Sequence, residues 1–356
     1  MVWAVNPRTW ISRRMFLTGA AAALASPVLM PVSRLFGTNQ PGAAVRLDRY
    51  CQTMGAIASV TVYGPDRDLC RAAVADVFTA MRMVDRLMSS FDPHSDLNLV
   101  NRHAGQDPVQ VPPELLRVIQ QSGDIWRATG GAFDVTIGPL LELYGFFSDS
   151  LRGPYPSDRA ISRTLESVGF RNVEIDGPSG TVRLSKPGAR IDLGGIAVGY
   201  ALDLTGASLR ARGITSALVN HSGDILAIGA PPGTTGWEIG IQDPNDSRGT
   251  IETMTIRDAS VSTSGNYENF RTLDEHVVGH ILDPAGGLSA SRYLSVTVVA
   301  GSSIEADALS TGIFAGGAVL EDGAIGNPTN IAVYAVSGVP GAIEAGYLRQ
   351  RSGGGR

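Results

Sequence analysis

The sequence predicts an α+β fold with a mixed, largely antiparallel sheet and packed helices. Helical and strand-like stretches follow one another without the strict strand–helix–strand alternation that is typical of a parallel sheet. Two strand-like runs, residues 173–175 and 181–184, flank Asp176-Gly177-Pro178, a turn sequence typical of a β-hairpin. The 356 residues are 43% hydrophobic and 18% charged, which excludes a disordered chain and provides enough apolar surface for a large core.

Helices are predicted where apolar side chains recur three and four residues apart. The longest covers residues 66–89 and has Leu69, Ala73 and Val77 on one face. The helix predicted over residues 113–128 begins with a proline, which suits a first helical turn because the amide there has no intrahelical partner. The other predicted helices cover residues 157–168, 200–211 and 303–314.

Strands are predicted where apolar and polar residues alternate or where β-branched residues cluster. Residues 56–63 alternate in this way and are followed by Gly64-Pro65, which ends the strand. The further predicted strands, besides the hairpin, cover residues 216–220, 237–242, 254–257, 294–300 and 331–336.

The chain is expected to have three parts. Residues 1–36 are predicted to be an export signal, and a short linker rich in Gly, Asn, Gln and Pro follows it. Residues 45–345 are predicted to form a single domain. The glycine-rich end, residues 346–356, is predicted to be a flexible tail.

The export signal is predicted from a twin-arginine pattern. Arg13 and Arg14 stand directly before an apolar run over residues 15–30, and no acidic residue precedes Asp48. The run is about 16 residues long, shorter than the roughly 20 that span a membrane. A buried N-terminal helix is the alternative. The twin-arginine interpretation implies export by the twin-arginine translocation machinery, and so a periplasmic or extracytoplasmic location.

The charge and the cysteines exclude some functions. The formal net charge is −5, whereas a sequence-independent nucleic-acid binder is normally basic, so we expect no nucleic-acid partner. The two cysteines, Cys51 and Cys70, have a spacing that matches no zinc or redox motif. In an oxidising compartment they could form a disulfide bond, and the sequence leaves open whether they do.

The first candidate site lies in residues 302–311. Ser302 and Glu305 have the spacing of a helix capping box, and Asp307 and Thr311, four residues apart, share one helix face. A carboxylate and a hydroxyl there could bind a hard cation such as Mg²⁺, and the helix N-terminus would favour an anion nearby. The alternative is a capped surface helix without a ligand.

Two further candidates are a glycine-rich segment and a histidine. Residues 191–200 contain Gly194, Gly195 and Gly199, which would let backbone approach a ligand, or else allow a tight helix–sheet contact. This segment matches neither the dinucleotide-binding nor the P-loop pattern. His280 follows a strand-like run and could act as a general acid or base, although a lone histidine is more often structural.

The fourth candidate is the segment 131–140. Asp134 and Thr136 alternate there with the apolar Phe133 and Val135. In an extended chain the two polar side chains would point to one face, where they could line a ligand. The alternative is an ordinary strand end.

Taken together and in this order, these segments resemble the ApbE family, the FAD:protein FMN transferases. The resemblance covers about residues 45–340 and rests on several ordered blocks: Met54-Gly55, Ser90-Phe91-Asp92-Pro93-His94-Ser95-Asp96-Leu97, Phe133-Asp134-Val135-Thr136, Asp192-Leu193-Gly194-Gly195-Ile196-Ala197-Val198-Gly199-Tyr200, Ser222-Gly223-Asp224, Thr263-Ser264-Gly265-Asn266-Tyr267-Glu268, His280-Ile281-Leu282-Asp283-Pro284 and Glu305-Ala306-Asp307-Ala308.

The resemblance implies a T-fold-like domain that binds FAD as substrate together with Mg²⁺. In the implied reaction a Thr or Ser hydroxyl of a target flavoprotein attacks the FMN phosphate of FAD, and AMP leaves. The acceptor would be an exported flavoprotein or a membrane redox subunit. An FAD pyrophosphatase that yields FMN and AMP, or a non-catalytic FAD-binding protein, are the alternatives.

The resemblance also implies roles for individual residues. Asp307 and Thr311 would give side-chain oxygens to Mg²⁺ and Gly195 a backbone carbonyl, while His280 would take the hydroxyl proton. The residues implied to contact FAD are Met54, Phe91, Ala132, Phe133, Asp134, Asp192, Val198 and Leu282.

The sequence departs from the family pattern at three positions. Val198 stands where many relatives have lysine, which removes a cation that could face a phosphate. Ser222 replaces the first glycine of a Gly-Gly-Asp block. Phe91 stands where an aromatic residue with a polar atom is frequent, which costs one possible hydrogen bond to the flavin.

Overall fold

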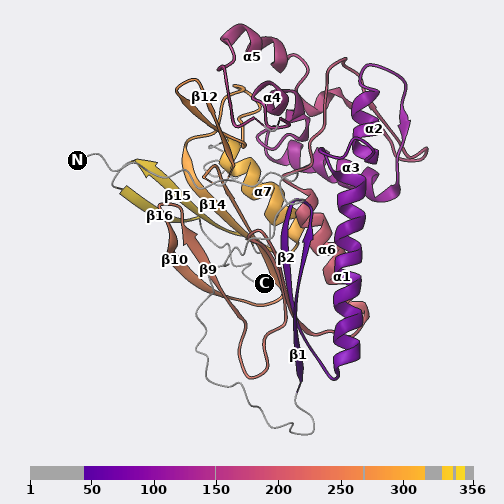
Figure 1. Ribbon diagram of the computed structural model, residues 1–356, viewed down its shortest axis with the longest axis vertical. Coiled ribbons are helices and arrows are strands. Elements are labelled where there is room, and N and C mark those ends of the chain that lie inside the picture. The colour runs from indigo at the N-terminus through magenta and orange to yellow at the C-terminus, as the bar shows by residue number, and fades with distance from the viewer. Residues whose placement is uncertain (1–43, 149, 268, 317–330, 340–341, 349–356) are drawn as a thin grey trace, which may run out of the picture. The chain divides into compact units, whose positions relative to one another are not determined.

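Figure 1 shows the computed structural model, which describes residues 44–148, 150–267, 269–316, 331–339 and 342–348. The expected export signal, residues 1–36, lies outside the described residues, as does the end of the chain from residue 349. Among the helices that the structure describes, none has the length and apolar character needed to cross a membrane.

An eight-stranded sheet forms the centre of the domain, and every neighbouring pair in it is antiparallel. The expectation of a largely antiparallel sheet is therefore confirmed. In spatial order its strands are β1 (Val45–Thr53), β2 (Ala56–Gly64), β7 (Ser216–His221), β8 (Asp224–Ile228), β11 (Ala259–Gly265), β14 (Tyr293–Ala300), β15 (Ala332–Val339) and β16 (Ala342–Leu348).

Three helices cover one face of this sheet: α1 (Arg67–Met88), α6 (Ala197–Ala211) and α7 (Ser303–Gly316). Helix α1 packs on β1 and β2, α7 packs on β11 and β14, and α6 lies between the other two and contacts both (Figure 1). The main core lies between the helices and the sheet, where Val60 and Val62 of β2 meet Val77 and Met81 of α1. Alternation in the strand and three-to-four spacing in the helix give each element one apolar side.

The remaining elements form smaller layers. Two three-stranded sheets have the orders β13-β12-β4 and β3-β6-β5, and β10 pairs with β9. Their bounds are β3 (Val109–Gln110), β4 (Arg152–Gly153), β5 (Val173–Asp176), β6 (Thr181–Leu184), β9 (Trp237–Asp243), β10 (Asp246–Ile256), β12 (Phe270–Leu273) and β13 (His276–Gly279). The other helices are α2 (Asp96–Arg102), α3 (Pro113–Ala128), α4 (Gly138–Leu143) and α5 (Asp158–Leu165), with 3₁₀ turns at Val135–Ile137 and Phe170–Asn172.

Most of the predicted helices and strands are confirmed, and α3 has the predicted bounds. The predicted hairpin is formed by β5 and β6. Two expectations are wrong. The segment around Asp134 is a 3₁₀ turn and not an extended strand, because the Asp134 carboxylate accepts the Thr136 amide and bends the chain. Strand β16 pairs with β15 as far as Leu348, so residues 346–348 belong to the sheet and not to the expected flexible tail.

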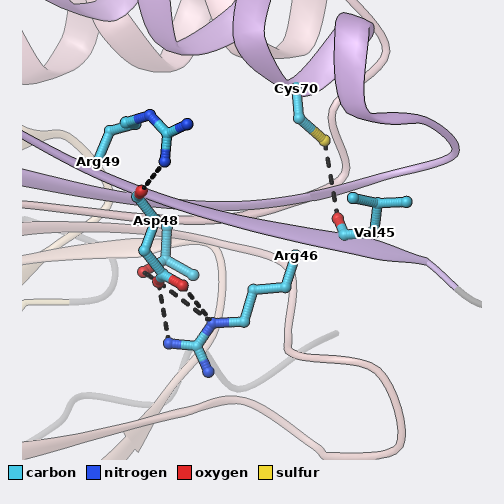
Figure 2. Close-up of polar contacts among 6 residues, drawn as sticks. Val45, Arg46, Asp48, Arg49 and Cys70 are labelled. Atoms are coloured by element: carbon cyan, nitrogen blue, oxygen red, sulfur yellow. Dashed lines mark hydrogen bonds and ion pairs between the residues drawn. The ribbon is translucent and has the colours of Figure 1, made fainter. Parts of the chain in front are cut away.

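Strand β1 forms one edge of the central sheet and has polar groups along it. The Asp48 carboxylate accepts hydrogen bonds from the Arg46 guanidinium (Figure 2). It also accepts one from the Thr61 hydroxyl at 2.6 Å. Charged side chains on an edge strand hinder pairing with another chain.

The two cysteines lie near this edge and are both free thiols in the structure. The Cys70 sulfur, buried in α1, lies 3.7 Å from the Val45 carbonyl oxygen (Figure 2). The Cys51 sulfur, in β1, has the Gln52 carbonyl and the Arg82 guanidinium as its neighbours. The disulfide that the sequence left open is therefore not formed here.

The turn between β7 and β8 contains the Ser222 departure. Ser222 and Gly223 have φ values of 54° and 99°, so both central residues occupy the region of positive φ that a type I′ turn requires. A serine in this region costs roughly 1–2 kcal/mol, whereas glycine adopts it without strain.

We therefore expect Ser222→Gly to raise the free energy of unfolding by up to about 1 kcal/mol, since the added freedom of the unfolded chain offsets part of the relieved strain. Denaturant unfolding measures this change. The matched control is Gly223→Ala, which should lower stability because alanine would be strained at the same turn. A Ser222→Gly variant no more stable than the wild type would contradict the strain argument.

Candidate active site

The site is built around a close approach of helices α6 and α7. A Cβ atom at Gly199 would lie 2.4 Å from the Ser303 carbonyl oxygen and 2.7 Å from the Ile304 Cα, so only glycine allows this approach. The Gly199 amide donates a 2.9 Å hydrogen bond to Oδ2 of Asp307. The glycine-rich segment thus makes a tight contact, but between two helices and not between a helix and the sheet as expected, and through it contacts a predicted metal ligand.

The three predicted metal ligands lie close to one another. A Cβ atom at Gly195 would lie 2.9 Å from Oγ1 of Thr311, which places the Gly195 backbone against the Thr311 side chain. Asp307 is one helical turn before Thr311 and shares its face of α7. Carboxylate, hydroxyl and carbonyl oxygens are the donors that Mg²⁺ prefers. The described part of the chain contains no group of three or more His, Cys, Asp and Glu side chains suited to a metal.

The electrostatics of Asp307 favour a cation at this position. Asp307 is only 5% exposed, and burial, together with the negative charge of Asp224, raises the pKa of its carboxyl well above the usual range. The Gly199 hydrogen bond opposes this rise. None of the ion pairs between described residues includes Asp307. A divalent cation would supply the missing positive charge, so the residues present fit Mg²⁺.

A row of hydroxyl groups connects Thr311 to Asp224. Ser264 Oγ lies 3.2 Å from Thr311 Oγ1 and 2.8 Å from Ser310 Oγ, and Ser310 Oγ lies 3.2 Å from Ser262 Oγ. The Ser262 hydroxyl in turn donates to the Asp224 carboxylate. Ser262 and Ser264 alternate along β11 and therefore both face α7. This row restrains the Thr311 hydroxyl from the side of the sheet, a role that the sequence motif alone did not reveal.

The N-terminus of α7 is occupied by a carboxylate of the protein itself. Asp203 of α6 accepts the Ser303 amide at 2.7 Å and the Ile304 amide at 3.1 Å, while Ser302 Oγ accepts the Glu305 amide at 3.4 Å. The predicted Ser302 cap is confirmed. The anion expected at this helix N-terminus is Asp203, so these amides are not left for a phosphate. Asp203 is four residues after Gly199, and this spacing could have indicated its role.

His280 is held by its backbone and by one ring nitrogen. Its amide and its Nδ1 both lie 3.1 Å from the carbonyl oxygen of Asn269. A carbonyl oxygen only accepts, so Nδ1 carries a proton and Nε2 of the neutral ring keeps a lone pair. Burial lowers the pKa of His280, the Arg271 charge lowers it further, and the Asn269 hydrogen bond and Asp192 raise it. The net lowering favours the neutral imidazole that a general base needs.

Asn266 fixes the segment that follows His280. Its Oδ1 accepts the Ile281 amide at 3.0 Å and its Nδ2 donates to the Ala290 carbonyl at 2.9 Å. A Cβ atom at Gly279 would lie 2.0 Å from Asn266 Cγ, so this contact requires the glycine. Leu282 is buried in this segment, and its backbone forms an antiparallel β-bridge with that of Ser289.

The segment with Ala132, Phe133 and Asp134 lies against α7. A Cβ atom at Gly312 would lie 2.9 Å from Cβ of the buried Phe133, and Ala132 beside it is half-buried. The Asp134 carboxylate accepts hydrogen bonds from the amide and hydroxyl of Thr136 and from the Phe170 amide. Burial raises the pKa of Asp134, and these hydrogen bonds oppose the rise.

Asp134 and Thr136 therefore bond to each other and do not line a polar face, which corrects the interpretation of this segment as an alternating strand. The carboxylate of Asp134 is used to turn the chain. The contact of this segment with FAD stays a prediction.

The stretch that leads into α6, from Asp192 to Val198, contacts the segment of residues 132–135. The Asp192 amide donates to the Val135 carbonyl oxygen at 2.7 Å, and Asp192 Oδ1 accepts the Gly194 amide at 2.9 Å. Val198 is half-buried in the first turn of α6 and packs against the main core. Three segments that are distant in sequence, residues 132–135, 192–199 and 307–312, thus meet in one place.

Met54 and Phe91 come from elsewhere in the fold. Met54 is in the β1–β2 turn with a φ of 48°, and its amide donates to Oδ2 of Asp85 at 3.0 Å. Phe91 follows α1, is 58% exposed and packs edge-on against Phe147, with ring centroids 5.6 Å apart.

Phe91 also lines a hollow of about 460 Å³, a size typical of small-molecule sites. The polar and aromatic side chains around it include Phe147, Asn98, Asn101, Arg102 and Arg190. The Arg190 guanidinium carbon lies 4.1 Å from the centre of the Phe147 ring. Glu142 also lines the hollow and pairs with Arg190 at 3.6 Å, so the hollow offers stacking surfaces and both signs of charge to a ligand.

Comparison with known proteins agrees with this geometry. The sequence profile of the ApbE family matches residues 54–325. The chain is 32% identical to an FAD:protein FMN transferase of Klebsiella pneumoniae over 266 residues, which are 74% of this chain and 76% of that protein. An FAD:protein FMN transferase of Vibrio cholerae is 30% identical over 300 residues, 82% of this chain and 85% of its own length.

Solved structures show the same fold. The crystal structure of the ApbE protein of Thermotoga maritima superposes with a TM-score of 0.75 and 30% identity, covering 82% of this chain and 94% of that one. The flavin transferase ApbE of Vibrio cholerae superposes with a TM-score of 0.73 and 26% identity, covering 85% and 96% of the two chains. The chain belongs to the ApbE family.

Proposed function

We propose that this protein is a Mg²⁺-dependent FAD:protein FMN transferase. The observation that carries the proposal is the meeting of the Gly195 backbone, Asp307 and Thr311 at the α6–α7 contact, in a fold that also holds His280 with Nε2 free to accept a proton. The similar proteins of Klebsiella pneumoniae and Vibrio cholerae carry the name of this activity.

In the proposed reaction a Thr or Ser hydroxyl of the acceptor flavoprotein attacks the phosphorus atom of the FMN half of FAD. The bond from that phosphorus to the AMP oxygen breaks, AMP leaves, and a phosphoester to the acceptor forms. Nε2 of His280 takes the hydroxyl proton. A bound Mg²⁺ would supply positive charge to the diphosphate, and Asp307, Thr311 and the Gly195 carbonyl would hold it.

The test of this function is incubation of the protein with FAD, Mg²⁺ and a Thr-containing acceptor flavoprotein, followed by mass spectrometry. The expected product is the acceptor with the added mass of FMN, together with free AMP. Free FMN and AMP without a modified acceptor would instead identify an FAD pyrophosphatase. Bound but unchanged FAD would identify a non-catalytic binding protein.

We also propose that the protein acts on the extracytoplasmic side of the membrane, with an exported flavoprotein or membrane redox subunit as acceptor. Arg13-Arg14 and the apolar run after them support this location. Retention of an Arg13→Lys, Arg14→Lys variant in the cytoplasm would test it, and unchanged export would count against the twin-arginine route.

The first prediction from the proposed function concerns the metal ligand. Asp307→Asn keeps the shape of the side chain but removes the charge that would bind Mg²⁺. We expect transfer to fall at least about 100-fold, a loss typical of one removed electrostatic contact to a reacting group, and added Mg²⁺ to raise the melting temperature less than in the wild type. Steady-state kinetics and thermal unfolding with and without Mg²⁺ measure both effects.

The matched control is Glu305→Gln, which removes an exposed carboxylate from the first turn of the same helix. It should retain transfer and the response to Mg²⁺. Undiminished transfer in Asp307→Asn would disprove the metal assignment.

The second prediction concerns the base. His280→Ala should leave FAD binding intact and slow transfer by roughly 10²–10⁴, the range for loss of a general base. Wild-type activity should fall on the acid side as His280 becomes protonated, and because the pKa of His280 is lowered, this fall should begin below the usual histidine range. A pH profile of kcat with saturating FAD measures it.

The control for this variant is His276→Ala, on the exposed end of strand β13 near His280. It should behave as the wild type. Loss of FAD binding in His280→Ala, with kcat unchanged for the bound fraction, would show a structural role instead.

The third prediction concerns the departure at Val198. A lysine there would add a cation at the first turn of α6, next to the proposed Mg²⁺ ligand Gly195. We expect Val198→Lys to tighten FAD binding by up to about tenfold, the equivalent of about 1.4 kcal/mol. Titration of flavin fluorescence measures the dissociation constant. Val198→Met, which lengthens the side chain without charge, is the control, and an equal gain in both variants would rule out the charge.

A further inference from the structure

Arg271 is a buried cation to which the proposed mechanism gives no role. It is the second residue of strand β12 and is 8% exposed. None of the ion pairs between described residues includes it. Burial of a cation without a carboxylate partner is costly, and burial lowers the pKa of Arg271 accordingly.

Among the described residues, the Arg271 guanidinium bonds to neutral oxygens, and these come from two separate segments. One is the loop after α4, where the carbonyl oxygens of Gly145 and Phe146 accept at 3.4 and 3.5 Å. The other is the entry to β12, where Asn269 Oδ1 and the Phe270 carbonyl accept at 3.3 and 3.2 Å. The guanidinium carbon also lies 4.8 Å from the centre of the Phe146 ring. Arg271 therefore ties residues 269–270 to the loop after α4.

Asn269 is the residue whose carbonyl oxygen receives both the amide and Nδ1 of His280. The position of that oxygen decides which ring nitrogen is protonated, since a histidine tautomer is set by the hydrogen bond that one nitrogen makes. The Arg271 guanidinium donates hydrogen bonds to the side chain of Asn269 and to the carbonyl oxygen of Phe270. A continuous series of contacts thus runs from the loop after α4 through Arg271 and Asn269 to His280.

We propose that Arg271 is a positioning residue for the transfer reaction, which keeps the Asn269 carbonyl against Nδ1 of His280 and so leaves Nε2 as the nitrogen that accepts the proton. The proposal rests on the proposed function, because it assigns His280 the role of base. Arg271 would not touch the substrate and would act on the reaction only by orienting His280.

A second effect follows from the charge of Arg271. The charged groups that act on His280 are Asp192, which raises its pKa, and Arg271, which lowers it, in addition to burial and the Asn269 hydrogen bond. Removal of Arg271 removes a positive charge that lowers the pKa of His280. The pKa of His280 should then rise, and the neutral base should be less abundant at a given pH.

The experiment compares Arg271→Met and Arg271→Lys with the wild type. Methionine keeps much of the side-chain length without charge or donors, and lysine keeps the charge but loses the fork of donors. Nitrogen NMR of labelled histidines reports the tautomer and titration of His280, whose signals are identified by their loss in His280→Ala. Arg152→Met, an exposed arginine of β4 in the same small sheet, is the control.

In the wild type we expect Nδ1 protonated and Nε2 unprotonated. In Arg271→Met we expect a mixture of both tautomers and a titration midpoint at higher pH. We also expect a kcat reduced roughly tenfold or more, with the KM for FAD changed less than about twofold. The acid limb of the pH profile should move to higher pH in the same direction as the NMR titration. Arg271→Lys keeps the positive charge but not the fork of donors, so we expect its titration midpoint to stay close to that of the wild type while its tautomers become mixed. Arg152→Met should match the wild type in both.

A wild-type tautomer and titration of His280 in Arg271→Met would overturn the inference, even if kcat fell. If Arg271→Met does not fold, as judged by circular dichroism, Arg271→Lys decides, and an undisturbed tautomer there would overturn it too. Failure of the wild-type protein to modify any acceptor would refute the proposed function instead. The NMR measurement on the protein without substrate therefore separates the two failures.

Discussion

The site depends on the contact between α6 and α7, where two rows of residues spaced four apart face each other. Gly199 and Asp203 lie on one helix, and Ser303 and Asp307 lie on the other. The missing side chain at Gly199 lets the backbones approach until its amide reaches the Asp307 carboxylate, and Asp203 holds the first amides of α7. Without this approach the backbone at Gly195 and the Thr311 hydroxyl would not meet.

The same contact creates an electrostatic requirement. Packing α7 against α6 and β11 removes Asp307 from water beside a second carboxylate, Asp224, and the hydroxyl row on β11 gives the site dipoles but no positive charge. At His280 the balance is the opposite, because burial, with a smaller contribution from the Arg271 charge, lowers the pKa of the ring and favours its neutral form. A buried carboxyl that needs a cation to be ionised at one position and a neutral proton acceptor at another are the two features on which the proposed transfer depends.

Much of the fold could be predicted from the sequence because it depends on local periodicity. Three-to-four spacing predicted α1, a first proline indicated the start of α3 and capping-box spacing the start of α7, alternation predicted β2, and a turn sequence predicted the hairpin of β5 and β6. The prediction failed where a hydrogen bond from a side chain or pairing with a neighbouring strand decided the local structure. Asp134 turns residues that alternate like a strand into a 3₁₀ turn, and β16 is set by pairing with β15 and not by its own composition. The very short strands β3 and β4 likewise depend on their partners.

By itself the sequence determined the elements, the shared helix face of Asp307 and Thr311, and the ordered motifs that resemble the ApbE family, because these depend on residue type and spacing along the chain. Only the tertiary structure decided that Gly195 meets Thr311, that Asp203 occupies the helix N-terminus, and that Arg271 reaches His280 through Asn269. The first two of these contacts join residues far apart in the chain, and no local pattern encodes which side chains of two packed elements will meet. Hydrogen-bond geometry and burial, which set charge and tautomer at the site, exist only once those elements have packed.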